Sequence, residues 1–182
     1  MKNNKNLPPQ IKQFYKERIN RIENYKNIDD WQNTNHKWMI HAFENNYMYN
    51  FDWLGRPIIQ MPSEIVCIQE LIWQVQPDLI IETGIAHGGS LILSASMLAL
   101  LDYCDAVSTK RSLDLSKNNR LVVGIDIDIR KHNREMINEH PLSNKIKVLE
   151  GSSVDKNVVN EIDVISRNFK KILVFLDSNH TH

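Results

Sequence analysis

The chain has no excess of charge of either sign, since its 182 residues include 22 Lys and Arg against 22 Asp and Glu. A polyanionic partner is therefore not indicated. The lysines are scattered, most densely near the N-terminus, and form no basic stripe of the kind that nucleic-acid binding requires. We expect no nucleic-acid partner.

Cysteine and long apolar runs are also scarce. Cys67 and Cys104 lie in apolar, helical contexts, so we expect buried free thiols in a reducing, cytoplasmic location rather than a disulfide framework. Residues 1–10 are polar and lack the apolar core of a signal peptide. The most apolar stretch, residues 91–101, is shorter than the roughly 20 residues of a membrane span. We therefore expect no transmembrane segment.

Apolar runs alternate with helical patterns in the second half of the chain. This alternation predicts an α/β fold, a Rossmann-like parallel sheet with flanking helices. A helix is expected to open at Pro62 with Ser63 as its N-cap. The predicted strands are residues 79–83, 121–126, 145–149 and 172–176, and the helices between them are residues 89–101, 130–140 and 154–165.

The first third of the chain has a different character. Apolar residues at helical spacing predict a helix from about residue 11 to residue 25, and residues 29–46 are also expected to be helical. Residues 50–59 are turn-rich and aromatic and predict a short hairpin. The predicted division is an N-terminal helical and aromatic extension, residues 1–61, followed by a partial Rossmann-like domain, residues 62–182.

The most informative stretch is Leu79–Ser90, a buried strand that turns through glycines into a helix. Glu82 offers a carboxylate at the crevice beyond the strand, where α/β folds bind nucleotide-like ligands. Gly84 allows the backbone to approach a ligand, Gly88 completes the loop, and His87 is placed to contact the ligand or to face solvent. The spacing fits neither the dinucleotide fingerprint nor the Walker loop. It looks like the first motif of class I S-adenosylmethionine-dependent methyltransferases, although a plain packing turn would also contain a glycine.

Further polar residues follow the next two strands. Asp126 closes the second strand and can accept hydrogen bonds from both ribose hydroxyls. Asp128 alternates with it and is expected to face solvent. Ser152 and Ser153 follow the third strand and could bond an adenine edge, although Ser153 could equally cap the next helix.

The fourth strand ends at Asp177, where the reacting end of a cofactor would lie. Asp177 could bind a divalent cation such as Mg²⁺ or act as a base. His180 is a candidate general base, because an imidazole titrates near pH ~6.5. A soft-metal site at His180 and His182 is the weaker alternative, since no third ligand accompanies the pair.

Five sequence words together resemble the cephalosporin hydroxylase / rhamnosyl O-methyltransferase family. The resemblance covers about residues 47–182 and rests on long ungapped words, which are residues 50–60, 69–73, 78–90, 124–130 and 176–182. It implies a class I methyltransferase fold with S-adenosyl-L-methionine and Mg²⁺ as ligands. Family members are associated with antibiotic tailoring and with methylation of glycolipid sugars.

Several residues match the family's motifs one by one. The resemblance implies cofactor binding by Glu82, Gly84 and Gly88, ribose binding by Asp126, and an adenine segment at Ser152 and Ser153. Asp177 matches the metal-binding aspartate, and His180 falls in the same loop.

The resemblance also implies strands and an acidic pair beyond residue 182. The sequence stops there, so we expect a truncated version of the fold, with four strands and an apolar edge that a homo-oligomer could cover. The expected function is O-methylation of a hydroxyl on a small molecule or glycan. The alternatives are a non-catalytic module that keeps part of the cofactor fold, and a hydroxylase with iron at Asp177, His180 and His182.

Overall fold

The computed structural model describes residues 7–115, 117 and 119–178. Its contacts divide the chain into two compact units, Met1–Met48 and Tyr49–His182. The division leaves the hairpin that begins near residue 50 in the second unit.

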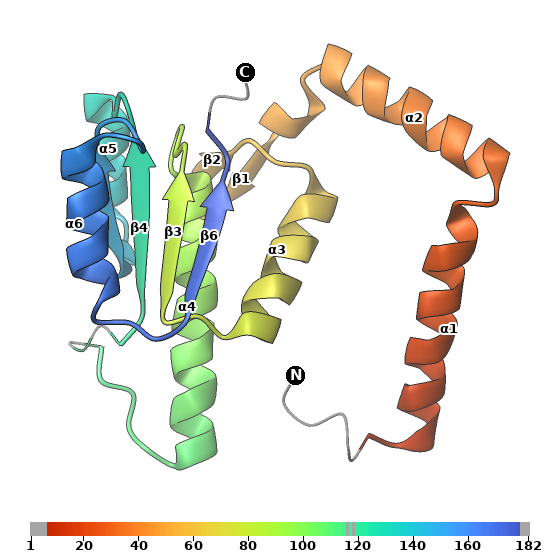
Figure 1. The fold of residues 1–182 in the computed structure, drawn as a ribbon, viewed down its shortest axis with the longest axis horizontal. Coiled ribbons are helices and arrows are strands. Elements are labelled where there is room, and N and C mark those ends of the chain that lie inside the picture. Colours follow the sequence, from red (N-terminus) through yellow and green to blue (C-terminus); the bar gives the residue numbers. More distant parts are fainter. Residues whose placement is uncertain (1–6, 116, 118, 179–182) are drawn as a thin grey trace. The chain divides into compact units, whose positions relative to one another are not determined.

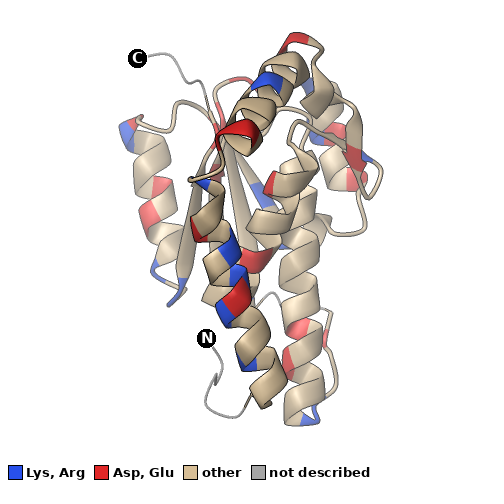
Figure 2. Cartoon of the chain, turned by 90° about the vertical axis from the view of Figure 1, so that its right-hand side faces the viewer, with Lys and Arg blue, Asp and Glu red and all other residues tan. Residues whose placement is uncertain are grey.

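The first unit contains two helices, α1 (Pro9–Tyr25) and α2 (Asp29–Glu44), as the apolar spacing predicts. Pro9 starts α1, where its missing N–H costs nothing. Tyr25 stacks on Trp31 across the turn, with ring centroids 5.0 Å apart. Basic and acidic residues are interspersed along α1 (Figure 2). No residue of α1 is buried, and its apolar face consists of the exposed side chains of Ile11, Phe14, Tyr15, Ile19 and Ile22.

A short 3-10 turn, Tyr47–Tyr49, contains the boundary between the units, and the second unit continues with the predicted hairpin. Its strands, β1 (Phe51–Trp53) and β2 (Arg56–Ile58), pair antiparallel. Leu54 and Gly55 form the two-residue turn, both with positive φ, which matches the twist of a tight hairpin. Trp53 Nε1 donates a hydrogen bond to Ser96 Oγ at 3.0 Å, which attaches the hairpin to the helix that carries Ser96.

The main sheet is parallel and has the strand order β5-β4-β3-β6 (Figure 1). The strands are β3 (Leu79–Thr83), β4 (Leu121–Asp126), β5 (Ile146–Glu150) and β6 (Ile172–Leu176), so the α/β prediction is confirmed. The order reverses beside β3, since the chain runs from β3 outward to β5 and then returns to β6. Such a reversal opens a crevice at the carboxyl ends of the strands.

Helices cover both faces of the sheet and enclose two apolar cores. One core lies against α3 (Pro62–Val75), α4 (Gly89–Thr109) and α5 (Lys131–Glu139), and it includes Ile72, Ile80, Leu98 and Ile137. The other lies against α6 (Lys156–Ser166) and includes Ile81, Val123 and Val158. Alternate residues of β3 therefore belong to opposite cores, which explains its nearly continuous apolar sequence. A 3-10 turn, Ser143–Lys145, precedes β5.

Helix α4 is longer than the sequence predicted, because it continues past Leu101 to Thr109. The continuation is possible because the buried Asp102 is neutralised. Arg120 Nη1 and Lys145 Nζ both donate to its carboxylate, the latter at 2.5 Å. Among the described residues, α4 is the helix whose length and composition would allow it to cross a membrane, and here its inner side is buried in the core.

Two smaller expectations were wrong. The N-cap of α3 is Met61 rather than Ser63, and the Glu64 carboxylate accepts a hydrogen bond from Met61 N at 2.7 Å. Cys67 is exposed and Cys104 is half-buried, although both are free thiols. Its apolar neighbour Val66 is also exposed, at 57%, so an apolar context in the sequence did not mean burial here.

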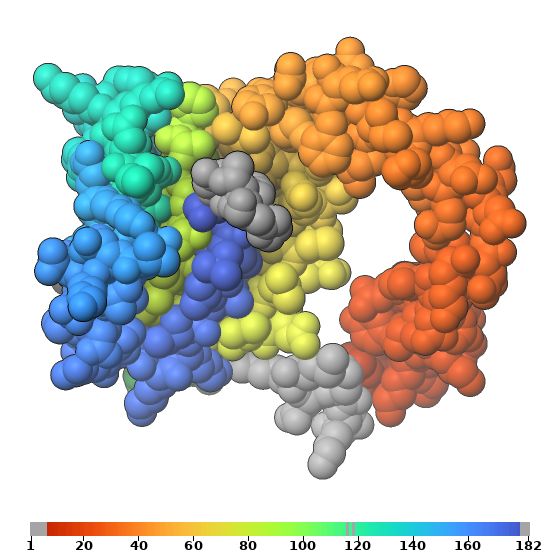
Figure 3. Space-filling view, turned by 45° about the horizontal axis from the view of Figure 1, so that its top comes forward, coloured from red at the N-terminus to blue at the C-terminus, as the bar shows by residue number. Residues whose placement is uncertain are grey.

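Strand β6 forms an edge of the sheet, since among the described residues it pairs with β3 alone. Its outer face carries Ile172, Val174 and Leu176, which are 41%, 51% and 77% exposed. Residues of this part of the chain lie at the surface between α6 and α3 (Figure 3). The apolar edge expected from the sequence is therefore present.

Candidate functional site

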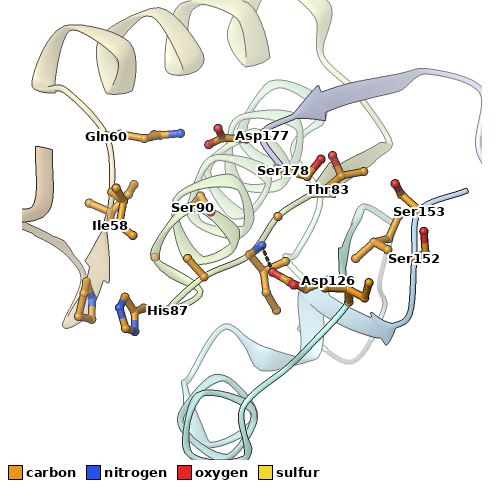
Figure 4. A pocket seen from close by; sticks show the side chains of 18 of the residues that line it. Ile58, Gln60, Thr83, His87, Ser90, Asp126, Ser152, Ser153, Asp177 and Ser178 are labelled. Atoms are coloured by element: carbon orange, nitrogen blue, oxygen red, sulfur yellow. Dashed lines mark hydrogen bonds between the residues drawn. The ribbon is translucent and has the colours of Figure 1, made fainter. Parts of the chain in front are cut away.

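A cavity of about 570 Å³ lies at the carboxyl ends of all four strands. The loop after each strand contributes to its wall, and the hairpin closes one side (Figure 4). The contributions are Thr83 to His87 after β3, Asp126 and Ile127 after β4, Gly151 to Ser153 after β5, Asp177 and Ser178 after β6, and Pro57 to Gln60 after β2. The cavity lies where the strand order reverses, as expected for an α/β ligand site.

The loop after β3 requires glycine at two positions. Gly84 has φ +83°, and a Cβ there would meet the backbone carbonyl of Asp177 well inside contact distance. Gly88 also has φ +83°, and its Cβ would come within 2.6 Å of Ile137 Cδ1. Gly84 therefore lets β3 and β6 end close together, and it lines the cavity. Gly88 lets the loop pack on α5 and is not among the lining residues.

Asp126 joins the second strand to this loop. Its Oδ2 accepts a hydrogen bond from Ile85 N at 2.9 Å, and the residue lines the cavity. Asp128 is exposed and lies outside the lining, although its backbone N–H donates to Asp126 Oδ1 at 3.3 Å. Each carboxylate oxygen of Asp126 thus accepts one backbone N–H, from Ile85 in the glycine loop and from Asp128, and each can still accept a further hydrogen bond.

Glu82 lies beneath the cavity rather than in its wall. It is 2% exposed, and Ser90 Oγ donates a hydrogen bond to its carboxylate. Ser90 itself lines the cavity. Burial raises the pKa of Glu82 from its ordinary 4.5 to about 7; the Ser90 hydrogen bond opposes this shift and the charge of Asp177 adds to it. Glu82 therefore exchanges a proton near neutral pH.

Ser152 and Ser153 both line the cavity. The alternative role for Ser153, capping of the next helix, is wrong, because Asp155 is the N-cap of α6 and accepts from Asn157 N at 2.7 Å. The Ser152 hydroxyl lies 3.5 Å from Val154 N. Two hydroxyls are therefore available on the β5 side of the cavity.

Asp177 and Gln60 approach the cavity from opposite sides. Figure 4 shows the Asp177 carboxylate and the Gln60 amide directed toward one another, with Ser90 nearby. The predicted His180 and the alternative ligand His182 lie outside the described residues. Within residues 7–178, apart from 116 and 118, no three His, Cys, Asp or Glu side chains gather in a metal-binding arrangement.

His87 is half-buried and lines the cavity at the far end of the loop. Its backbone carbonyl accepts a hydrogen bond from Arg56 Nε at 3.1 Å, so the hairpin holds this part of the loop. The structure therefore brings His87 together with Asp126, Ser152, Ser153 and Asp177 around one space.

The sequence reasoning missed several lining residues, notably Thr83, Ser90 and Gln60. Thr83 Oγ1 and Gln60 Oε1 are buried atoms without a hydrogen-bond partner in the described structure. Buried polar atoms normally have partners, so an orphan in a cavity wall indicates a place for a ligand or water. A period-two reading of β3 could have pointed Thr83 toward the crevice, whereas no local signal placed Gln60 there.

Comparison with known proteins assigns the family. The model of the rhamnosyl O-methyltransferase/CmcI family matches residues 45–182, and the chain belongs to this family. The matched region begins just before the hairpin and includes every residue of the cavity wall. No curated protein matches the chain.

Solved structures with a similar fold also carry the CmcI name. The chain is 17% identical to cmcI-N160 SAH, covering 72% of this chain and 54% of that one, with a TM-score of 0.46. The chain is 19% identical to the CmcI-N160 apo-structure, covering 74% of this chain and 48% of that one, with a TM-score of 0.48. It is 17% identical to cmcI-D160 Mg-SAM, covering 72% of this chain and 47% of that one, with a TM-score of 0.47. The chain spans about half the length of the solved structures it matches.

Proposed function

We propose that the chain is an S-adenosyl-L-methionine-dependent O-methyltransferase that acts, with Mg²⁺, on a hydroxyl of a sugar, a glycolipid or a small secondary metabolite. The observation that carries the proposal is the single cavity in which Asp126, Gly84 and Asp177 meet at the ends of adjacent parallel strands. Family membership supports the same reaction class.

The residues present fit an adenosyl ligand. Asp126 has a carboxylate at the cavity wall that can accept from ribose hydroxyls, and charged acceptors make the stronger hydrogen bonds. Ser152 and Ser153 lie beside it and can bond an adenine edge. Thr83 Oγ1 needs a partner that a bound ligand could supply. Gly84 lets β3 and β6 end close together beside this wall, and the buried Glu82 accepts a hydrogen bond from Ser90, which lines the cavity.

The Mg²⁺ part of the proposal rests on oxygen chemistry at the other end of the cavity. Asp177 presents a carboxylate, and hard cations prefer oxygen ligands completed by water and substrate. Figure 4 shows the amide nitrogen of Gln60 facing Asp177, so Gln60 would supply its carbonyl oxygen to this space with the amide flipped. A bound Mg²⁺ would lower the pKa of an acceptor hydroxyl and orient it.

This chain's own residues would then prepare the acceptor. Asp177, and His180 three residues later in the sequence, are the candidate bases for the hydroxyl proton. Holding both reactants in one cavity would supply much of the rate. The methyl group passes from the sulfonium sulfur to the hydroxyl oxygen, and the hydroxyl proton passes to the base.

Methyl transfer to a panel of sugars, glycolipids and small hydroxylated metabolites tests the activity directly. Radiolabelled methyl groups should appear in an acceptor, and excess chelator should abolish the signal until Mg²⁺ is restored. Tight cofactor binding with no turnover on any acceptor would instead support a non-catalytic module. Asp177→Asn should remove turnover while leaving cofactor binding within about twofold, because its role lies at the metal and acceptor end.

The remaining expectations extend this proposal. We place the protein in the cytoplasm, with an extension over residues 1–61 and the methyltransferase domain over residues 62–182. We also propose that it self-associates, since Ile172, Val174 and Leu176 expose an apolar strand face that a second copy could cover.

A further inference from the structure

The buried Arg56 belongs to the hairpin but makes its hydrogen bonds elsewhere. It is 3% exposed, and its Nε and Nη2 both donate to the His87 carbonyl, the first at 3.1 Å. Nη2 also donates to Asn133 Oδ1 at 3.2 Å, and Nη1 lies 2.7 Å from Met136 Sδ. Arg56 therefore links β2 to the glycine loop and to α5.

Asn133 completes the same arrangement from α5. It is 4% exposed, and its Nδ2 donates to the Ala86 carbonyl at 3.0 Å while its Oδ1 accepts from Arg56. Two consecutive loop carbonyls, those of Ala86 and His87, are thus held by two buried side chains. On the opposite side, Ile85 N is held by Asp126. The loop is tied at three consecutive residues by groups from three separate elements.

The loop needs such support because its backbone is strained. Ala86 has φ +43°, a left-handed conformation that non-glycine residues adopt at a cost of about 1 kcal/mol or more. Gly84 and Gly88 on either side are also left-handed. Without Arg56 and Asn133 the loop would relax toward other conformations, and ligand binding would have to restore this one.

The chemistry of Arg56 fits a positioning role better than a simple ion pair. Burial lowers the pKa of Arg56, and the charge of Asp52 partly offsets this. The acceptors of its guanidinium hydrogen bonds are neutral, namely the oxygens of His87 and Asn133 and the sulfur of Met136. A buried cation is costly without strong partners, and here the offsetting bonds go to the loop and its support.

We propose that Arg56, together with Asn133, is the positioning residue that sets the glycine loop in its ligand-binding conformation before the ligand arrives. The hairpin then contributes to ligand binding, because it holds the glycine loop in position. This inference rests on the proposed function, because the ligand it prepares for is the adenosyl cofactor. Such preorganisation improves affinity by removing the ordering cost from the binding step.

Hydrogen exchange of the ligand-free full chain tests the positioning role without requiring any binding. Arg56→Lys keeps the positive charge but loses the paired N–H donors of the guanidinium. Asn133→Asp keeps an acceptor for Arg56 but loses the N–H donor to the Ala86 carbonyl. In both variants the hydrogen-bonded amides of Ile85 and Gly88 should exchange at least about tenfold faster, while those of β3 and β4 stay unchanged. Ser96→Ala is the matched control, because it loses the hairpin's bond to α4 and leaves the loop bonds intact.

Calorimetric titration with S-adenosylhomocysteine then measures the consequence for binding. The Kd should rise about tenfold in Arg56→Lys and Asn133→Asp with the stoichiometry unchanged. Each variant loses a hydrogen bond to a loop carbonyl, and a bond worth about 1.4 kcal/mol corresponds to a tenfold change in Kd. A reduced stoichiometry at unchanged Kd would mean a partly unfolded protein and would overturn the positioning role. Unchanged loop exchange in Arg56→Lys would overturn it as well. A wild-type chain that binds no cofactor would instead refute the proposed function, whatever the loop exchange shows.

Discussion

At the scale of single residues, Glu82 has the clearest electrostatic consequence. Its carboxyl is buried with a pKa raised from 4.5 to about 7, so the folded state holds a proton that the unfolded state releases above pH 4.5. The free energy of unfolding should therefore fall between pH 4.5 and pH 7, by roughly 3 kcal/mol from this group. Below pH 4.5 both states are protonated and the contribution is fully present.

Glu82→Gln should remove this pH dependence, because the amide does not titrate. Urea unfolding at pH 4.5, 6 and 8 would give a gap between wild type and variant that shifts in favour of the variant as the pH rises. If the two proteins lose stability in parallel over this range, Glu82 is not the titrating group.

Gly84 and Gly55 form a matched pair for backbone space. Both have φ +83°, but a Cβ at Gly84 would meet the Asp177 backbone, whereas one at Gly55 would meet nothing within 4 Å. Gly55→Ala should lower the free energy of unfolding by about 1 kcal/mol from conformation alone. Gly84→Ala should lose at least about 1 kcal/mol more, because the end of β6 must move. Equal losses in chemical denaturation would mean that the β3–β6 approach is loose.

At the scale of elements, the C-terminal half of α4 depends on one buried carboxylate, that of Asp102. Asp102 accepts hydrogen bonds from Arg120 and Lys145, and all three side chains are about nine-tenths buried. Although burial opposes it, hydrogen bonds to Asp105 and Asp102 raise the pKa of Arg120, which stays charged. Asp102→Ala should therefore cost about 3–5 kcal/mol, since the buried Lys145 loses its carboxylate partner and Arg120 keeps the ion pair with Asp105 alone.

The matched surface change is Asp163→Ala, which breaks an exposed bond to Arg167 one turn away on the same helix. That pair should contribute less than about 0.5 kcal/mol. Thermal unfolding of the two variants should separate them by several degrees. Similar melting temperatures would contradict the structural role of Asp102.

The elements also show what the sequence could and could not predict. The strands and the crevice acids followed from local patterns, because the apolar period of β3 and the glycines after it are decided by neighbouring residues. The extension of α4 beyond Leu101 could not be predicted, because Asp102 is acceptable there only through Arg120 and Lys145, distant in sequence. The role of the hairpin was missed for the same reason, since Arg56 contacts His87 and Asn133 through space.

At the scale of the whole molecule, the exposed apolar face of β6, formed by Ile172, Val174 and Leu176, predicts self-association. Light scattering after size exclusion should give a mass above that of one chain, increasing with concentration. Val174→Lys should shift it toward the monomer by placing a charge on the exposed strand face. Val164→Lys on α6, where the residue is 62% exposed, is the control and should leave the mass unchanged. A wild-type monomer at all concentrations would refute self-association.

For the whole molecule, we propose an adenosyl site assembled from the ends of four strands and one hairpin. We propose that cofactor recognition depends most on Asp126, because this residue lines the cavity and accepts a hydrogen bond from Ile85 N in the glycine loop. Asp128, two residues later, has the same carboxylate, but it is exposed and does not line the cavity.

Calorimetric titration with S-adenosyl-L-methionine, comparing wild type with Asp126→Ala and Asp128→Ala, therefore tests the central claim most directly. We predict binding by the wild type, a loss of at least about tenfold in affinity for Asp126→Ala, and a change of less than about twofold for Asp128→Ala. Equal binding by all three proteins, or no binding by a folded wild type, would contradict the account.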